Sequence, residues 1–252
     1  MKMSFSLTIR VVHPPSQEDP FLVVDKPSCL PSAPLFDGQD SALTQAVRLF
    51  PQLNGVVGKK AVERGLLHRL DTAARGLLLI AATQHSYDAL SASQVRGEFC
   101  KGYSARCRFL PKDERGVMQG FPPAPFEIPL ECLQDEPVRV CVCSRFRHWG
   151  ANGSQSRPVT DLSGKAAIKK SSPVVYETLM SLRCASGEIL ADCSIARGFK
   201  HQVRCHLAWL GFPVAGDELY CPEASAGETL EFCATTLRFP HPLTGQQVVI
   251  TL

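Results

Sequence analysis

The residues best suited to chemistry are concentrated in one short segment, residues 68–75, with the sequence HRLDTAAR. Apolar runs typical of buried strands flank this segment on both sides. We therefore expect a charged turn at the end of a sheet, where rigid strands hold its side chains in place. Between Arg69 and Arg75, the carboxylate of Asp71 should stay ionised, which suits a nucleophile or a base. The alternative is that Asp71 only forms an ion pair with one of these two arginines.

A second group of polar residues, 200–206 (KHQVRCH), falls on the strongest helical pattern of the chain, predicted over 199–210. Arg204 adjoins the apolar stripe of this helix and could point sideways into a site. His201 and His206 are five residues apart rather than four, and no glutamate follows His201, so a zinc protease helix is excluded. We interpret both histidines as hydrogen-bonded structural residues.

A tyrosine follows a glycine in the segment 101–103 (KGY), at the start of a predicted strand over 103–109. An aromatic residue at such a position is usually part of the core. Tyr103 could equally be a platform on which a nucleobase stacks.

Several short elements must position these residues. The patterns predict helices over 41–50 and over 83–96, the latter capped by Thr83 with Tyr87, Leu90 and Val95 facing inward. Strands are expected over 21–24, 66–67 and 76–81, with hairpins over 174–184 and 188–195, and over 235–239 and 248–252. Because strands dominate and few βαβ alternations occur, we predict an α+β fold with a mixed, mostly antiparallel central sheet flanked by helices and loops.

Composition excludes several classes of protein. The chain has 252 residues, 44% hydrophobic and 20% charged, which is typical of a globular protein. Its eleven cysteines are odd in number and contain no CxxC pair, so neither a disulfide framework nor a paired zinc site is expected. The net charge of +3 is small, but residues 145–170 carry six lysines and arginines against one aspartate. We interpret this segment as a basic loop, either a solvated surface or a phosphate-contacting arm.

Six segments of the sequence, taken together, resemble the motifs of a known protein family. Residues 68–71 (HRLD) with 76–81 (GLLLIA) resemble the central motif of the RluA-type pseudouridine synthases, which isomerise uridine to pseudouridine in RNA. Five further segments resemble landmarks of that family in the same order: 23–28 (VVDKPS), 101–103 (KGY), 198–207 (GFKHQVRCHL), 211–220 (GFPVAGDELY) and 232–242 (FCATTLRFPHP). Residues 111–170 have no match. Any one of these motifs is weak, but six in the family's order are specific.

The resemblance implies a pseudouridine-synthase-like catalytic domain and three catalytic residues. Asp71 matches the catalytic aspartate, Tyr103 the tyrosine that packs on the uracil, and Arg204 the arginine that pairs with the aspartate. The reaction breaks the C1′–N1 bond, turns the uracil and rejoins it through C5. The carboxylate could attack C1′, attack C6 or remove a proton on the way to a glycal, and none of these routes requires a metal or an organic cofactor. Residues expected to bind RNA or the substrate base are His68, Arg69, Arg75, Lys101, Lys200, His201, Gln202 and Phe232.

Two departures from the family pattern affect RNA binding. Ala74 and Arg75 stand where the family has Thr-Ser, and Phe199 stands where it has an arginine. Arg75 could replace the missing arginine as a partner of phosphate or of Asp71. Because Asp71, Tyr103 and Arg204 are all present, we expect activity, and a non-catalytic RNA-binding protein on the same scaffold is the alternative.

The organisation expected from these matches is one catalytic domain over 1–252, with 111–170 as a loop-rich insertion. Too few residues precede Phe21 for the family's appended S4-type RNA-binding domain. RNA selection would then come from the catalytic domain and the insertion. The expected partner is rRNA or tRNA with the target uridine flipped into the site. With no apolar run of membrane-spanning length and no export signal, we expect a cytoplasmic monomer.

Overall fold

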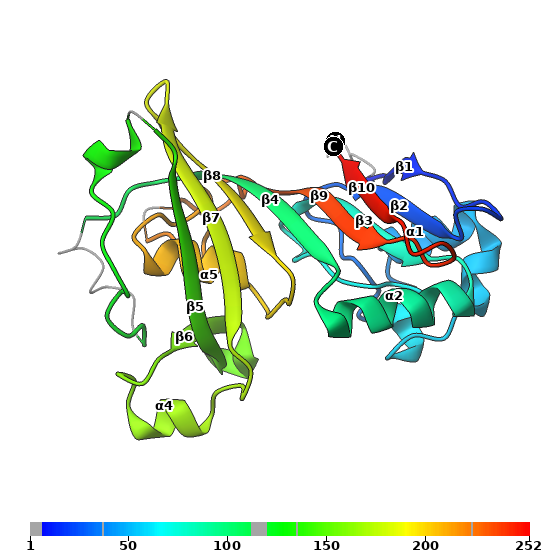
Figure 1. Ribbon diagram of the computed structural model, residues 1–252, viewed down its shortest axis with the longest axis horizontal. Coiled ribbons are helices and arrows are strands. Elements are labelled where there is room, and N and C mark those ends of the chain that lie inside the picture. The colour runs from blue at the N-terminus through cyan, green and yellow to red at the C-terminus, as the bar shows by residue number, and fades with distance from the viewer. Residues whose placement is uncertain (1–6, 37, 112–119, 135, 223) are drawn as a thin grey trace, which may run out of the picture. The chain divides into compact units, whose positions relative to one another are not determined.

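The chain forms two compact units. The computed structural model describes residues 7–36, 38–111, 120–134, 136–222 and 224–252 (Figure 1). Unit 1 consists of Met1–Lys101 and Cys233–Leu252, and unit 2 consists of Gly102–Phe232. Strand β4 (Cys100–Cys107) begins in unit 1 and continues into unit 2, and β9 (Phe232–Pro240) begins at the last residue of unit 2.

Unit 1 is built on a sheet whose strand order is β1-β2-β3-β9, with β10 also pairing β9. Its other strands are β1 (Arg10–His13), β2 (Phe21–Lys26), β3 (Arg75–Ala81) and β10 (Gln247–Thr251). All pairs are antiparallel except β3 with β9, which run parallel. Strand β3 is buried from its second residue onward, as expected of an apolar run. The predicted terminal hairpin is confirmed by β9 and β10.

Two helices cover the sheet of unit 1, α1 (Ala42–Leu49) and α2 (Gln84–Arg96) (Figure 1). Both predicted helices are confirmed, and Ser41 and Thr83 cap their N-termini through hydroxyls that accept from backbone N–H groups. Tyr87 and Leu90 are buried as predicted, but Val95 is 71% exposed. That prediction was wrong because the turn of α2 carrying Val95 packs through Ser93 instead. Short 3₁₀ turns, η1 (Pro51–Gly55) and η2 (Ala61–Glu63), follow α1.

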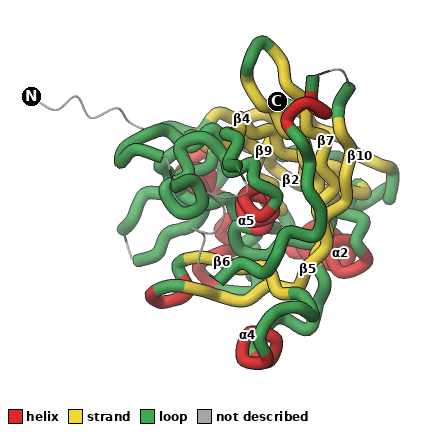
Figure 2. The backbone as a smooth tube through the Cα atoms, turned by 90° about the vertical axis from the view of Figure 1, so that its left-hand side faces the viewer, coloured by secondary structure: helices red, strands yellow, loops and turns green. Residues whose placement is uncertain are grey.

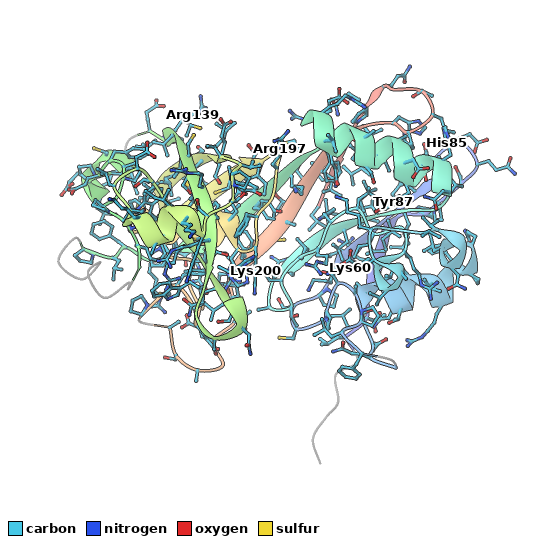
Figure 3. The ribbon with its side chains drawn as sticks, turned by 90° about the horizontal axis from the view of Figure 1, so that it is seen from below. Lys60, His85, Tyr87, Arg139, Arg197 and Lys200 are labelled. Carbon is cyan, nitrogen blue, oxygen red and sulfur yellow. The ribbon has the colours of Figure 1, made fainter. Side chains whose placement is uncertain are left out.

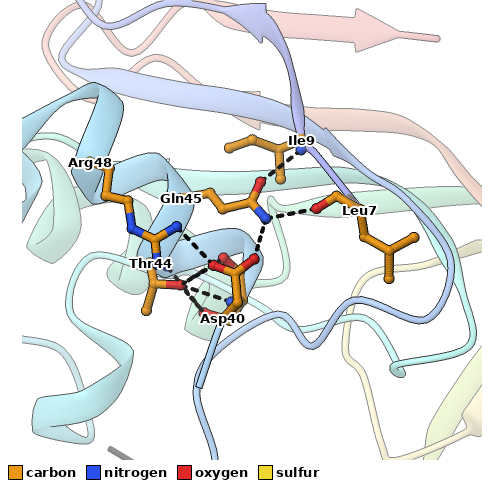
Figure 4. A network of polar contacts seen from close by, with 7 residues as sticks. Leu7, Ile9, Asp40, Thr44, Gln45 and Arg48 are labelled. Atoms are coloured by element: carbon orange, nitrogen blue, oxygen red, sulfur yellow. Dashed lines mark hydrogen bonds and ion pairs between the residues drawn. The ribbon is translucent and has the colours of Figure 1, made fainter. Parts of the chain in front are cut away.

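The start of α1 is tied to the N-terminal segment by a polar network around Asp40 (Figure 4). The Asp40 carboxylate accepts hydrogen bonds from Gln45 at 2.6 Å and from Arg48 at 3.0 Å. The Gln45 amide also accepts from the N–H of Ile9 and donates to the carbonyl of Leu7. One side chain of α1 thereby satisfies the backbone of a segment more than 30 residues earlier in the chain.

Unit 2 holds a sheet of order β4-β8-β7-β5-β6. Its strands are β5 (Val138–Trp149), β6 (Gln155–Val159), β7 (Tyr176–Ala185) and β8 (Glu188–Ile195). The pairs β5–β6, β5–β7 and β7–β8 are antiparallel, which confirms the hairpin predicted across residue 187. A buried cluster of Phe146, Cys205, Ala208 and Tyr220 packs α5 (Gln202–Trp209) against this sheet. Two 3₁₀ turns, η3 (Leu130–Leu133) and η4 (Ala151–Gly153), complete the unit.

The basic segment 145–170 is not a loop, so that interpretation was wrong. Residues 145–149 belong to β5 and residues 155–159 to β6, and the helix α4 (Lys165–Lys169) lies beside this hairpin in Figures 1 and 2. Along β5 exposed and buried residues alternate, with Val142, Ser144 and Phe146 inside. The many arginines on the outer face of the strand concealed this period-two pattern.

Two smaller boundaries also differ from the sequence patterns. Residues 66–67 form only an isolated bridge from Leu66 to Ile80. Helix α5 begins at Gln202 rather than at residue 199, because His201 adopts a left-handed backbone conformation with φ of 57°. All eight residues of α5 are buried, so this helix has no solvent face. Within the described residues, no helix combines the length and the apolar character that crossing a membrane requires.

Candidate active site

The turn that carries Asp71 is held by a buried lysine. The side chain of Lys26, at the end of β2, is fully buried, and its Nζ donates to the carbonyls of Leu30 at 2.7 Å and Pro27 at 2.9 Å. A third hydrogen bond, of 3.2 Å, reaches the carbonyl of Thr72, the residue after Asp71. Burial lowers the pKa of Lys26 to about 8, and attraction to Asp71 is the largest opposing effect. The Lys26 ammonium and the Asp71 carboxylate therefore attract each other electrostatically.

Ser32 holds the other side of the same turn. Its buried hydroxyl donates to the carbonyl of Leu70 at 2.8 Å and accepts from the N–H of Leu70 at 3.0 Å. Within the turn, the N–H of Ala74 donates to the carbonyl of Asp71. Backbone groups on both sides of half-buried Asp71 are thus anchored from the β2 end of unit 1. Sequence reasoning missed both anchors, although a lysine at the end of a strand that begins with four apolar residues was a visible signal for one of them.

His68 is a neutral residue in this turn. Its Nε2 accepts from the N–H of Leu79 at 3.2 Å, so Nδ1 carries the proton. Burial, with a smaller effect from Lys101, lowers the pKa of His68 to about 3. Nδ1 is out of contact with solvent and has no hydrogen-bond acceptor among the described residues. Lys101 is buried too, with its Nζ 5.7 Å from the ring centre of Phe99, and burial lowers its pKa to about 8.

The two arginines of the turn differ in their surroundings. Arg69 is exposed and forms an ion pair of 2.9 Å with Glu63. Arg75 is the exposed first residue of β3 and pairs in register with Cys233 of β9. Arg69 is therefore engaged with a carboxylate other than Asp71.

In unit 2, Tyr103 stacks on Phe232. The ring centres are 5.1 Å apart and the planes differ by 6°, and both residues are buried. Tyr103 lies on β4 and Phe232 at the start of β9, so a predicted catalytic residue and a predicted substrate-binding residue form one stacked aromatic pair. Such a pair can present a rigid apolar edge to a base.

Arg204 is buried on α5 and forms a two-pronged ion pair with Asp217. Its Nε and Nη2 donate to the two carboxylate oxygens at 2.7 and 2.6 Å. The guanidinium also lies 5.5 Å from the ring centre of Tyr220. This geometry fixes the plane and direction of Arg204. Asp217 received no role from sequence reasoning, although it lies in the motif 211–220.

The residues before and at the start of α5 connect this helix to its surroundings. Lys200, labelled in Figure 3, donates to the carbonyl of Gly153 at 2.8 Å. His201 makes a 3.1 Å hydrogen bond between Nδ1 and the Tyr220 hydroxyl. The buried Gln202 accepts from the N–H of Phe199 and donates to the carbonyl of Glu177. The hydrogen bonds of the Gln202 amide therefore stabilise the folded structure around the start of α5.

The predicted site residues are distributed over both units. Unit 1 contains His68, Arg69, Asp71, Arg75 and Lys101. Unit 2 contains the remaining six: Lys200, His201, Gln202, Tyr103, Arg204 and Phe232. Within unit 1 the structure shows a pinned Asp71 turn, and within unit 2 it shows the Tyr103–Phe232 stack and the Arg204–Asp217 pair. The joint action of Asp71, Tyr103 and Arg204 stays a prediction.

Comparison with known proteins identifies the family. Residues 20–209 match the family model described as RNA pseudouridylate synthase. The dual-specificity RNA pseudouridine synthase RluA of Escherichia coli K12 is 28% identical over 236 residues, which covers 92% of this chain and 88% of that protein. The ribosomal large subunit pseudouridine synthase D of Zymomonas mobilis is 26% identical over 243 residues, which covers 92% of this chain and 66% of that protein.

Solved structures show the same fold. The human RNA pseudouridylate synthase domain containing 1 superposes with a TM-score of 0.65 at 18% identity, covering 98% of this chain and 83% of that one. The human RNA pseudouridylate synthase domain containing 4 superposes with a TM-score of 0.60 at 17% identity, covering 96% of this chain and 87% of that one. These matches confirm the predicted α+β pseudouridine-synthase fold, and the family match confirms the predicted activity. With a family model that spans most of its length, the chain belongs to the RNA pseudouridylate synthase family.

Proposed function

We propose that the Asp71 carboxylate is the reacting group with which this enzyme converts uridine in structured RNA to pseudouridine. The observation that carries this proposal is the anchoring of the Asp71 turn by Lys26 and Ser32, because a reacting group must be held in one geometry. Lys26, which anchors the turn, is also attracted electrostatically to Asp71, and this attraction opposes the effect of burial on the pKa of Lys26.

The reaction balances without a co-reactant. The C1′–N1 bond of uridine breaks, a C1′–C5 bond forms, and the proton on C5 leaves while N1 gains one. Asp71 can serve by attack on C1′, by attack on C6 or as the base of a glycal route, and these alternatives stay open. The product is an isomer of the substrate, so no electrons are exchanged and no cofactor is part of the proposal.

The remaining residues receive roles by the same reasoning. The Tyr103–Phe232 stack supplies the apolar wall that a flipped uracil needs. Arg204, oriented by Asp217, would pair with Asp71. His68 stays a predicted substrate-binding residue, although its Nδ1 is out of contact with solvent. The other residues expected to bind RNA keep that role as a prediction: Arg69, Arg75, Lys101, Lys200, His201 and Gln202. Gln202 would act indirectly, by holding the start of α5 in place.

We further propose rRNA or tRNA as the substrate, one catalytic domain with residues 111–170 as an insertion, and action as a cytoplasmic monomer. The names of the two relatives support ribosomal and dual RNA specificity only at the level of the family. Light scattering coupled to size-exclusion chromatography measures the molar mass in solution and so tests whether the protein is a monomer. Separate treatment of the rRNA and tRNA fractions tests the substrate.

The decisive experiment compares wild type with Asp71→Asn, which keeps the shape of the side chain and removes its charge. Both proteins are incubated with rRNA and tRNA from cells that lack the gene, and pseudouridine is mapped by carbodiimide labelling. We expect new pseudouridine with wild type and none with the variant, at unchanged circular dichroism. An active variant would remove Asp71 from the mechanism. RNA binding by a wild type that makes no pseudouridine would identify the non-catalytic alternative.

A further inference from the structure

A groove of about 630 Å³ opens on the surface of unit 1, lined by the helix α1 and by the segments before and after it in the chain. Leu43 and Val47, one turn apart on α1, are part of its lining. Three further apolar lining residues are exposed: Leu35 by 80%, Phe36 by 65% and Val62 by 46%. Exposed apolar patches rimmed by polar residues mark interaction sites, whereas single exposed apolar residues do not. The groove therefore offers both space and an apolar surface to a ligand.

The charged residues that line this groove are arginines. Arg48 and Arg64 belong to the lining, and no acidic residue is found in the described part of it. Arg48 forms an ion pair of 3.0 Å with Asp40 (Figure 4). Arg64 forms no ion pair with a described residue, and its Nη1 donates to the backbone carbonyl of Asn54 at 3.0 Å. That hydrogen bond is exposed and leaves the other N–H groups of the guanidinium for a ligand.

The backbone of Arg64 adopts a conformation that favours glycine. Its φ is 45° and its ψ is −130°, outside the regions that residues with a Cβ usually adopt. The carbonyl of Arg64 packs so closely against Gly58 that a Cβ at position 58 would collide with it, which restrains this conformation. Glycine at position 64 would adopt it with less strain, and strained residues are concentrated at binding and active sites. The strain therefore indicates that the side chain of Arg64 has a role of its own.

Both sides of the groove are connected to the turn that carries Asp71. The segment on one side follows Ser32, whose hydroxyl exchanges hydrogen bonds with the backbone of Leu70. The segment on the other side contains Glu63, which forms the ion pair with Arg69. The two residues before Asp71 thus contact both sides of the groove. The groove belongs to the same part of unit 1 as the Asp71 turn, where nucleotides next to a bound uridine would lie.

We propose that this groove binds an unpaired nucleotide of the substrate RNA next to the reacting uridine, with its base on Phe36 and its phosphate on Arg64. The proposal rests on the proposed function of the chain and adds a contact outside the predicted site residues. Aromatic side chains for the bases and cations for the backbone are the usual combination in proteins that bind single strands. A second copy of the chain is a poorer occupant, because pairing two such grooves about a two-fold axis would bring their arginines together.

The test measures binding of fluorescent U20 RNA and of an abasic ribose-phosphate chain of the same length at several salt concentrations. We expect Phe36→Ala to weaken U20 binding about tenfold and to leave binding of the abasic chain unchanged, because only a base can stack. Arg64→Gly should weaken binding of both probes and reduce the slope of log K against log salt by about 0.7, the value for one phosphate contact on a single strand. The melting temperature of Arg64→Gly should not fall, since glycine relieves the backbone strain.

Each variant has a matched control in unit 2. Leu162→Ala removes an apolar side chain that is 78% exposed, and Arg139→Ala removes an exposed arginine of β5 (Figure 3). Both controls should keep the U20 affinity and the salt slope of wild type. Should Phe36→Ala be poorly folded by circular dichroism, Phe36→Leu takes its place, since it keeps apolar bulk and removes the ring.

Several results would overturn the inference. Wild-type U20 affinity in a folded Phe36 or Arg64 variant would do so, as would a loss that the two control variants share. A lower melting temperature of Arg64→Gly with unchanged RNA binding would give this arginine a purely structural role. A Phe36-dependent change in molar mass, or Phe36-dependent binding to phosphatidylglycerol vesicles, without an effect on U20 would assign the groove to a second copy or to a membrane. Pseudouridine formation by wild type is measured separately, so failure here leaves the proposed function untouched.

Discussion

At the scale of single residues, Asp71 owes its setting to groups far away in the sequence. Lys26 is 46 residues from Thr72, and Ser32 is 38 residues from Leu70, yet together they fix the backbone on both sides of the carboxylate. The two buried anchors replace water as partners of carbonyls that the turn would otherwise leave unpaired. Lys26 is thus a positioning residue for Asp71.

Replacing Lys26 with methionine tests this role. Three carbonyls lose a charged donor, so Lys26→Met should lower the free energy of unfolding by about 3 kcal/mol. Below its melting temperature the folded variant should lose about 100-fold in kcat with little change in KM, because Asp71 is misplaced while RNA contacts remain. Denaturant titration and pseudouridine kinetics measure the two effects. Lys59→Met, at an exposed lysine, is the control, and a folded Lys26→Met with wild-type kcat would refute the role.

At the scale of elements, the parallel pairing of β3 with β9 depends on one glycine. Gly76 pairs with Ala234 and has a φ of 116°, and a Cβ at this position would collide with the backbone of Ala234. This close approach aligns the strand that follows the Asp71 turn with the C-terminal hairpin. The glycine of the motif 76–81 is therefore required by geometry.

Gly76→Ala should accordingly lower the free energy of unfolding by at least about 2 kcal/mol, since it combines backbone strain with a steric clash. Activity should fall in parallel, because the turn moves with β3. Gly55→Ala provides the comparison, because a Cβ there meets nothing within 4 Å. Chemical denaturation of both variants measures the difference in the free energy of unfolding. Equal stabilities would contradict the conclusion that the pairing of β3 with β9 requires glycine at position 76.

At the scale of the whole molecule, a buried histidine links stability to pH. His206 is fully buried on α5 between the hydroxyls of Ser144 and Thr178, each at 2.8 Å. Burial lowers the pKa of His206 to about 3 from the value of 6.5 usual for a histidine side chain. The structural role expected for this histidine is confirmed. In the unfolded chain the same ring takes up a proton near pH 6.5, so protons favour unfolding.

The free energy of unfolding should therefore fall as the pH drops below 6.5 towards 3, by up to about 1.4 kcal/mol per pH unit from this group. Urea titrations between pH 7 and 5 measure the slope before most carboxylates titrate. The variant His206→Gln should show a smaller dependence of the free energy of unfolding on pH, even if its stability is lower at every pH. His85→Gln, at an exposed histidine labelled in Figure 3, should not. Identical slopes in all three proteins would mean that His206 takes up its proton at the same pH in the folded and the unfolded chain, which would refute the prediction.

The sequence by itself determined the family, the helices capped by Ser41 and Thr83, the hairpins and the residues of the Asp71 turn. Each of these follows from neighbours along the chain, through periodicity, capping or the order of motifs. Only the tertiary structure decided that residues 145–159 form a hairpin, that Val95 faces solvent, and that Lys26 and Asp217 are the partners of Thr72 and Arg204. Burial and hydrogen-bond partners of this kind are contributed by segments distant in sequence, and local spacing carries no record of them.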